Sequence, residues 1–249
     1  MHDLKLWCLA CWKKTMKFRI KVFADGADLE DMVRAYRSGA VHGFTTNPTL
    51  MRKAGVSDYE SFARKVLGEI VDLPISFEVF SDLLDEMVRQ ARLIASWGSN
   101  VYVKIPITNT GGEPTKGIIR SLSGEGIRLN VTAITTLDQV ASVTESLSET
   151  TPAIVSVFAG RIADTGLDPV PIMQEALQIL RARPRAELLW ASPREVLNIV
   201  QAEAIGCHII TITNDLLKKI PILGTDLADM SLQTVKMFHD DANAAGFCL

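Results

Sequence analysis

The stretch that decides the fold is "VYVKIPI" (101–107), which is followed by "TKGIIRSLSGEG" (115–126) and "RLNVTAIT" (128–135). The first and third segments are rich in β-branched residues, which favour strands, and the middle segment suits a helix. A strand, a helix and another strand in this order indicate a parallel pair joined by a helical crossover. The same period recurs on both sides of this unit.

About eight strand-then-helix units follow one another along the chain. The expected strands are 18–25, 42–48, 74–80, 101–107, 128–135, 153–160, 186–193 and 208–213. The expected helices are 29–39, 58–71, 83–98, 115–126, 136–148, 168–183, 194–206 and 214–220. Eight units in about 200 residues fit a closed barrel. The alternative, an open doubly wound sheet, is weakened because no G-x-G-x-x-G follows the first strand.

We therefore predict an α/β fold, a single (β/α)8 TIM barrel over residues 16–225 with an extra C-terminal helix. Residues 1–15 are expected to form an N-terminal extension outside the core, because the chain from Met16 starts a strand directly. Residues 226–249 lie beyond the eighth unit and are expected to form a helical tail. The apolar residues of this tail suit packing on a neighbouring subunit.

Composition narrows the class of protein. The chain has 249 residues, a formal charge of −3 and 47% hydrophobic residues, as a soluble globular protein does. The mild acidity gives no reason to expect nucleic acid as a partner, and no apolar run is long enough to cross a membrane. Scattered cysteines favour a cytoplasmic protein. Cys8 and Cys11 form a C-x-x-C without a second pair at zinc spacing, so we expect no metal.

The fourth expected strand carries a lysine within an apolar run. Successive strand residues face opposite sides, so Val103 and Ile105 suit the helix layer, whereas Tyr102 and Lys104 face the barrel axis. A buried ammonium is costly unless it is paired or loses its proton. Lys104 therefore needs partners on neighbouring strands.

The same alternation places other polar residues inside the barrel. These inward residues are Asp25, Glu78, Lys104, Asn130, Thr132, Ser156 and Ser192. On the seventh strand, Leu189 and Ala191 are expected to face outward. For any single position a satisfied core group is the favoured explanation, but the joint pattern gathers at the carboxyl ends of the strands, where barrel active sites lie.

Two interpretations of Lys104 remain at this point. It forms a structural ion pair with Asp25 or Glu78, or its amine forms a Schiff base with a carbonyl substrate. An amine must be neutral to attack, and burial favours the neutral form. Carboxylates beside it would then move protons to and from the substrate oxygen, directly or through water.

Six motifs in one order resemble the transaldolase family over about residues 18–215, and the short length is similar to small transaldolases and fructose-6-phosphate aldolases. The motifs are "TTNPTL" (45–50), "FEV" (77–79), "VKIP" (103–106), "GIRLNVT" (126–132), "SVFAGRI" (156–162) and "ASPR" (191–194). The resemblance implies a Schiff-base enzyme that transfers a dihydroxyacetone unit between sugar phosphates. It also implies a homo-oligomer, possibly a decamer, and no cofactor.

The resemblance implies a role for each matching residue. Lys104 is the Schiff-base lysine, Asp25 transfers protons, and Glu78 and Thr132 hold the catalytic water. The implied substrate contacts are Thr46 and Asn47 in the loop, Asn130 and Ser156 at the sugar hydroxyls, and Arg161, Ser192 and Arg194 at the phosphate. Arginine forks suit phosphate in any case; without the resemblance, solvated arginines at helix starts are equally expected.

Four positions bear on the reaction type. Glu78 and Asn130 resemble transaldolases, since the fructose-6-phosphate aldolases carry glutamine at the first position. Thr135 replaces the family's usual aromatic residue, and Pro193 replaces an aromatic in "ASFR". These two changes indicate a specialised sugar substrate. A lyase that does not transfer, and a sugar-phosphate-binding barrel without turnover, stay as alternatives.

Overall fold

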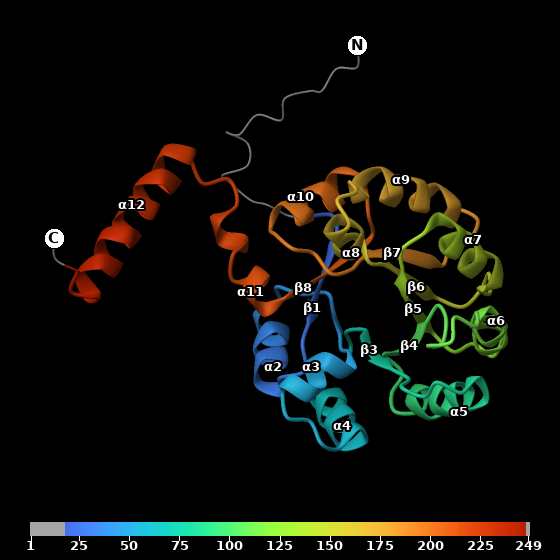
Figure 1. Cartoon of the computed structure of the whole chain (residues 1–249). Coiled ribbons are helices and arrows are strands. Elements are labelled where there is room, and N and C mark those ends of the chain that lie inside the picture. Colours follow the sequence, from blue (N-terminus) through green and yellow to red (C-terminus); the bar gives the residue numbers. More distant parts are fainter. Residues whose placement is uncertain (1–17, 248–249) are drawn as a thin grey trace, which may run out of the picture. The chain divides into compact units, whose positions relative to one another are not determined.

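The computed structural model describes residues 18–247 (Figure 1). Residues 18–218 form one compact unit, and residues 219–247 belong to a second. The expected extension, residues 1–15, lies outside the described residues. The two units are described one after the other.

Eight parallel strands close a barrel in the order β1 to β8, which confirms the predicted TIM barrel. The strands are β1 (Lys21–Asp25), β2 (Gly43–Thr45), β3 (Ile75–Glu78), β4 (Val101–Pro106), β5 (Leu129–Ile134), β6 (Ala153–Val157), β7 (Ala186–Trp190) and β8 (Ile209–Thr213). The first and last strands pair along their whole length, from Lys21 opposite Ile209 to Asp25 opposite Thr213. This pairing closes the ring, so the sheet has no free edge strand.

Helices follow each strand and lie on the outside of the strand ring (Figure 1). In this unit they are α2 (Leu29–Ser38), α3 (Pro48–Lys53), α4 (Tyr59–Glu69), α5 (Leu84–Ala95), α6 (Lys116–Gly124), α7 (Leu137–Ser146), α8 (Ala159–Asp164), α9 (Pro169–Leu180), α10 (Leu197–Ala204) and α11 (Asn214–Leu217). The short helices α3 and α8 were not expected. Each begins within four residues of a strand end. The expected strands 42–48 and 153–160 included these helix starts, so the sequence pattern did not reveal the helices.

The side chains of β4 face the sides that the alternation predicts. Val103 and Ile105 are fully buried, and Lys104 sits between them with 6% of its surface exposed. Glu78 of β3 and Asn130 of β5 lie directly opposite Lys104 on its two neighbouring strands. Because parallel neighbours at one level point the same way, these three side chains share the barrel interior.

The expected orientation of β7 is wrong. Leu189 and Ala191 belong to an apolar cluster with Phe23, Ile154 and Ile209. Each of these three partners stands two residues before a polar residue of the barrel interior and so faces the same way. Both faces of β7 are apolar, so its alternation carries no signal that distinguishes the two sides. The side chains therefore occupy the opposite faces from those expected.

A bulge interrupts β5 just after Thr132. The register between β5 and β6 shifts between Val131 and Ile134, and Ala133 has a φ of 62°. A non-glycine residue in the left-handed region costs free energy and persists where the surrounding structure requires it. The bulge ends the regular alternation at Thr132, on the strand next to Lys104.

The second unit contains a short 3-10 helix, η1 (Ile220–Ile222), and the long helix α12 (Leu227–Ala244). Asp226 caps α12 by accepting hydrogen bonds from the backbone N–H groups of Ala228 and Asp229. No residue of α12 is buried. Among residues 18–247, no helix is long and apolar enough to cross a membrane.

Candidate active site

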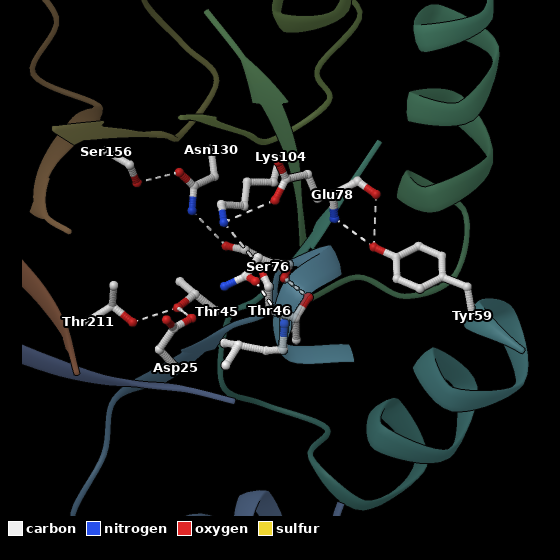
Figure 2. A network of polar contacts seen from close by, with 12 residues as sticks. Asp25, Thr45, Thr46, Tyr59, Ser76, Glu78, Lys104, Asn130, Ser156 and Thr211 are labelled. Atoms are coloured by element: carbon white, nitrogen blue, oxygen red, sulfur yellow. Dashed lines mark hydrogen bonds and ion pairs between the residues drawn. The ribbon is translucent and has the colours of Figure 1, made fainter. Parts of the chain in front are cut away.

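Lys104 lies at the centre of the polar contacts in the barrel (Figure 2). Its Nζ is 3.2 Å from Glu78 Oε2 and donates a hydrogen bond of 3.1 Å to the Thr46 carbonyl. The exposed fractions of the Lys104 and Glu78 side chains are 8% and 17%, so this ion pair is largely shielded from solvent. A buried lysine with two oxygen partners fits both interpretations, a structural ion pair and a nucleophilic amine.

Asp25 stands at the carboxyl end of β1 and is held from the next strand. Thr45 Oγ1 donates to Asp25 Oδ1 at 2.7 Å, and the Thr45 and Thr211 hydroxyls lie 2.5 Å apart. Burial raises the pKa of Asp25 above its ordinary value, although the Lys104 charge and the Thr45 hydrogen bond act in the opposite direction. A carboxyl group with a raised pKa near an amine suits proton transfer.

A second line of hydrogen bonds crosses the interior from β3 to β6. Ser156 Oγ donates to Asn130 Oδ1 at 2.6 Å, and Asn130 Nδ2 donates to Ser76 Oγ at 2.9 Å. All three side chains are buried. The line fixes the orientation of the Asn130 carboxamide beside Lys104, as Figure 2 shows.

Thr132 and the β2–α3 loop complete the predicted set near the lysine. Thr132 Oγ1 is buried and has no hydrogen-bond partner among the described residues. Thr46 Oγ1 donates to the Ser76 carbonyl, while the Thr46 carbonyl accepts from Lys104. Asn47 Oδ1 accepts from the Leu50 N–H and caps α3, so this side chain has a structural role in the loop.

Ser192 follows β7 in a tight loop. Its φ of 57° lies in the left-handed region, and its carbonyl approaches Gly160 of α8 closely. A Cβ built on Gly160 would lie 1.5 Å from the Ser192 carbonyl oxygen, so only glycine fits there. Helix α8, which follows β6, and the loop after β7 are therefore in direct backbone contact.

The two predicted phosphate arginines flank this contact. Arg194 Nε donates to Asp164 Oδ1 at 2.9 Å, and a second hydrogen bond from Arg194 makes the pair bidentate. These bonds hold the pKa of Asp164 below its ordinary value, and the charge of Arg161 lowers it further. Arg161 on α8 and Arg194 on the loop after β7 thus lie near one carboxylate.

Residues 18–247 hold no group of three or more histidine, cysteine, aspartate or glutamate side chains that could bind a metal ion. The C-x-x-C of Cys8 and Cys11 lies outside the described residues. Cys207 is buried, and burial raises the pKa of its thiol to about 12. This thiol is therefore protonated and unreactive at neutral pH.

Comparison with known proteins identifies the family. The profile described as "Transaldolase/Fructose-6-phosphate aldolase" matches residues 22–247. The chain belongs to this family. The resemblance drawn from the six motifs is confirmed, and with it the expectation of a transaldolase-like enzyme.

Relatives of similar length support the family assignment. A probable transaldolase of Dehalococcoides mccartyi is 35% identical over 194 residues, which cover 78% of this chain and 86% of the relative. A probable transaldolase 2 of Listeria monocytogenes is 34% identical, with 81% and 88% covered. A probable transaldolase of Streptococcus equi subsp. zooepidemicus is 36% identical, with 81% and 90% covered.

Solved structures share the barrel fold at low sequence identity. KGPDC from Streptococcus mutans has a TM-score of 0.54 at 11% identity, over 79% of this chain and 88% of that one. The 3-hexulose-6-phosphate synthase from Salmonella typhimurium has a TM-score of 0.53 at 15% identity, over 78% and 89%. These likenesses concern the fold alone.

Within the transaldolase-family barrel, three side chains missed from the sequence support the predicted ones. Strand alternation could have revealed Thr211, because it is the polar residue between Ile210 and Ile212 on β8. Thr45 lies in the "TTNPTL" motif, where Thr46 and Asn47 drew attention instead. Tyr59 begins α4 and contacts the Glu78 backbone, a long-range contact that no local pattern indicates.

Asp25→Asn should raise the stability of the protein at neutral pH. Folded Asp25 has a pKa above that of the unfolded chain, so the folded state loses stability as pH rises through the window between the two values. Asparagine keeps an acceptor for Thr45 and removes the buried carboxylate. Thermal melting at pH 5 to 8 should show a higher Tm than wild type, and the gain should shrink towards pH 4.

Asp164→Asn is the matched control, because Arg194 lowers the pKa of this carboxyl group. Its contribution to stability is present above the ordinary aspartate pKa and is lost as pH falls. The control should therefore leave Tm unchanged or lower it at neutral pH. An Asp25→Asn variant that melts below wild type across the range would show that Asp25 stabilises the fold.

Proposed function

We propose that the chain is a Schiff-base transaldolase that moves a dihydroxyacetone unit from a ketose phosphate to an aldose phosphate. The observation that carries this proposal is the position of Lys104, buried in the barrel and held between Glu78 and the Thr46 carbonyl. The charge of Lys104 also reaches Asp25. A nucleophilic amine with two carboxyl groups near it has every group type that an imine aldolase requires.

In the first step, the Lys104 amine attacks the ketone carbon of the ketose and forms a carbinolamine. A proton moves to the former carbonyl oxygen, which leaves as water, and a carbon–nitrogen double bond remains. Glu78, which lies 3.2 Å from the amine, would give and take this proton. The imine then acts as an electron sink for the bond that breaks next.

In the second step, the bond between C3 and C4 of the donor breaks. Asp25 takes the proton of the donor's C4 hydroxyl, the aldose phosphate leaves as an aldehyde, and the electron pair moves to the imine nitrogen as an enamine. The enamine carbon then attacks the acceptor aldehyde, and the proton returns to the new hydroxyl. Water finally hydrolyses the imine, which restores the molecule lost in the first step.

The catalytic water would lie between Glu78 and Thr132. The hydroxyl of Thr132 is buried without a partner among the described residues, and a buried polar atom of this kind normally binds water or ligand. A carboxylate at position 78 can accept a proton from that water, which a glutamine cannot do. What supports transfer is the resemblance of Glu78 to transaldolases, in which the three-carbon enamine is kept until an acceptor arrives.

Polar residues around the lysine would bind the sugar. We assign Asn130 and Ser156 to its hydroxyls, because they are already oriented by the hydrogen bonds that cross from β3 to β6. Thr46 and Asn47 would contact the substrate from the β2–α3 loop. The backbone of this loop is fixed by the cap of α3, so it offers a preorganised wall.

The phosphate would be bound by Arg161 on α8 and by Ser192 and Arg194 on the loop after β7. Arginine recognises phosphate through bidentate hydrogen bonds. Asp164 currently occupies Arg194 in that manner, and about half of each side chain is exposed. A phosphate would therefore share Arg194 with Asp164 or displace the carboxylate, and Arg161 would add a second positive charge.

Lysis without transfer is the alternative reaction, and Thr135 is the observation that favours it. This residue is exposed, and its N–H donates to Gln139 Oε1, so no aromatic side chain covers the site at this position. Water would then reach the enamine more easily. A sugar-phosphate-binding barrel without turnover is disfavoured, because binding alone does not require Lys104 beside Glu78 and Asp25.

We also propose a cytoplasmic homo-oligomer, possibly a decamer, in which the tail from residue 226 packs on a neighbouring copy. Leu232, Val235 and Met237 of α12 have exposed fractions of 53%, 60% and 50%. Apolar residues gathered on one exposed helix favour an interface. The fractions of charged and of hydrophobic residues are both ordinary, which agrees with a cytoplasmic location.

Lys104 should form a covalent imine with fructose 6-phosphate or a related ketose phosphate. Borohydride should fix a three-carbon adduct on this residue, as measured by intact mass and peptide mapping, and Lys104→Ala should abolish it. Lys21→Ala is the control, because Lys21 pairs with Glu187 at the other end of the barrel. An adduct on another lysine, or activity in the Lys104→Ala variant, would refute the mechanism.

Glu78→Gln should shift the reaction from transfer towards lysis. With a ketose phosphate donor, adding an aldose phosphate acceptor should raise glyceraldehyde 3-phosphate formation in wild type well above the donor-only rate. The Gln variant should release more free dihydroxyacetone per turnover, whereas Glu187→Gln should keep the wild-type ratio. If wild type turns over donor alone as fast as donor plus acceptor, the lyase reading is correct.

Deleting residues 226–249 should convert the assembly to a smaller species, because this removes the apolar surface of α12. Light scattering measures the mass of both forms. Replacing Leu232 and Val235 by serine keeps the chain length and should have the same direction of effect. An unchanged large assembly in both variants would mean that other surfaces hold the subunits together.

A further inference from the structure

Beyond Ser76, β3 is not paired with β2. β2 pairs with β3 only as far as Thr45 opposite Ser76, and the Thr46 N–H still donates to the Ser76 carbonyl. If the ladder continued in this register, the Glu78 N–H would donate to the Thr46 carbonyl, and the Glu78 carbonyl would accept from residue 48. Residue 48 is Pro48, which begins α3 and has no N–H.

The hydroxyl of Tyr59 takes the place of both missing partners. The Glu78 N–H donates to Tyr59 Oη at 2.7 Å, and Tyr59 Oη donates to the Glu78 carbonyl at 2.9 Å. One side chain from α4 thus pairs both backbone groups of the residue that carries the carboxylate. Figure 2 shows Tyr59 approaching Glu78 from the side away from Lys104.

This substitution leaves the Thr46 carbonyl available to the lysine. Lys104 Nζ donates to that carbonyl at 3.1 Å, the position that the Glu78 N–H would occupy in a regular ladder. Thr46 is otherwise held by its own N–H and Oγ1, which both donate to the Ser76 carbonyl. The carbonyl that receives the lysine is therefore fixed in place.

We propose that Tyr59 is a positioning residue that holds Glu78 in register and leaves the Thr46 carbonyl to Lys104. The inference rests on the proposed function, in which Lys104 is the nucleophile and Glu78 the neighbouring acid–base group. Tyr59 touches no reacting atom in this scheme. It acts through the backbone of Glu78 and, indirectly, through the acceptor of the lysine.

The ring of Tyr59 is held by aromatic neighbours, so its hydroxyl has little freedom. Its ring centroid lies 5.5 Å from that of Trp97, 5.6 Å from that of Phe80 and 6.2 Å from that of Phe77, each with edge-on geometry. Burial raises the pKa of Tyr59 far above its ordinary value, so the hydroxyl keeps its proton and can donate at any working pH.

Tyr59→Phe removes the hydroxyl and keeps the ring. The Glu78 N–H then lacks its acceptor, and the Thr46 carbonyl, its partner in a regular ladder, becomes an alternative for which it competes with Lys104. We expect the rate of borohydride-trapped imine formation and kcat to fall about 10- to 100-fold, the effect of a misplacement near 1 Å, with the KM for the ketose phosphate little changed. Deuterium exchange of the peptide covering residues 75–80 should become faster.

Two control variants separate positioning from general loss of stability. Tyr36→Phe removes a hydroxyl that bonds to Asp72 on the surface, and should leave kcat and imine formation unchanged. Trp97→Phe loosens the aromatic packing and keeps the Tyr59 hydroxyl, and should lower Tm while keeping most of kcat. The proposal is overturned if Tyr59→Phe traps the imine as fast as wild type.

It is also overturned if Tyr59→Phe and Trp97→Phe lose kcat in proportion to their loss of Tm, because that is the signature of a purely structural role. Failure of the proposed function gives a different result. In that case wild type itself forms no adduct on Lys104, which removes both the mechanism and the role of Tyr59 in it.

Discussion

The placement of a lysine amine inside a closed barrel is the constraint on which the rest of the site depends. Lys104 is 6% exposed, so its charge has little access to water. Removing one partner of a buried ion pair typically costs about 3–5 kcal/mol, because the other charge is left unpaired. Glu78 and the Thr46 carbonyl meet this requirement together. Glu78 would also serve an imine mechanism, so stability and chemistry both draw on this contact.

Two separate lines of hydroxyl and amide groups keep the polar residues of the barrel interior in order. One line joins Asp25 to β2 and β8 through Thr45 and Thr211, and the other joins β3 to β6 through Asn130. Both lie within the barrel, where a fixed orientation is maintained by strands on either side. Side chains on such strands are placed more reproducibly than side chains on loops, which suits groups that must exchange protons over short distances.

Much of this site could be predicted from the sequence, because strand alternation has a period of two and polar residues inside apolar strands reveal which face is which. Lys104, Glu78 and Asn130 were found in this way, and the register places them side by side. β7 could not be oriented, since Leu188, Leu189 and Trp190 are all apolar and all buried. Tyr59 could not be found, because its bonds to Glu78 depend on how a helix start meets a strand end 19 residues away in sequence.

The close approach of Gly160 to the Ser192 carbonyl has a consequence for changing substrate preference by design. Arg161 lies on α8 and Arg194 on the loop after β7, and the backbones of these two segments touch at a point that admits no side chain. If one segment were grafted alone from another barrel, its backbone would not fit against the backbone of the segment that it contacts. Helix α8 and the loop after β7 therefore form one unit, and exchange experiments that aim at a different anionic group should move residues of both segments in a single step.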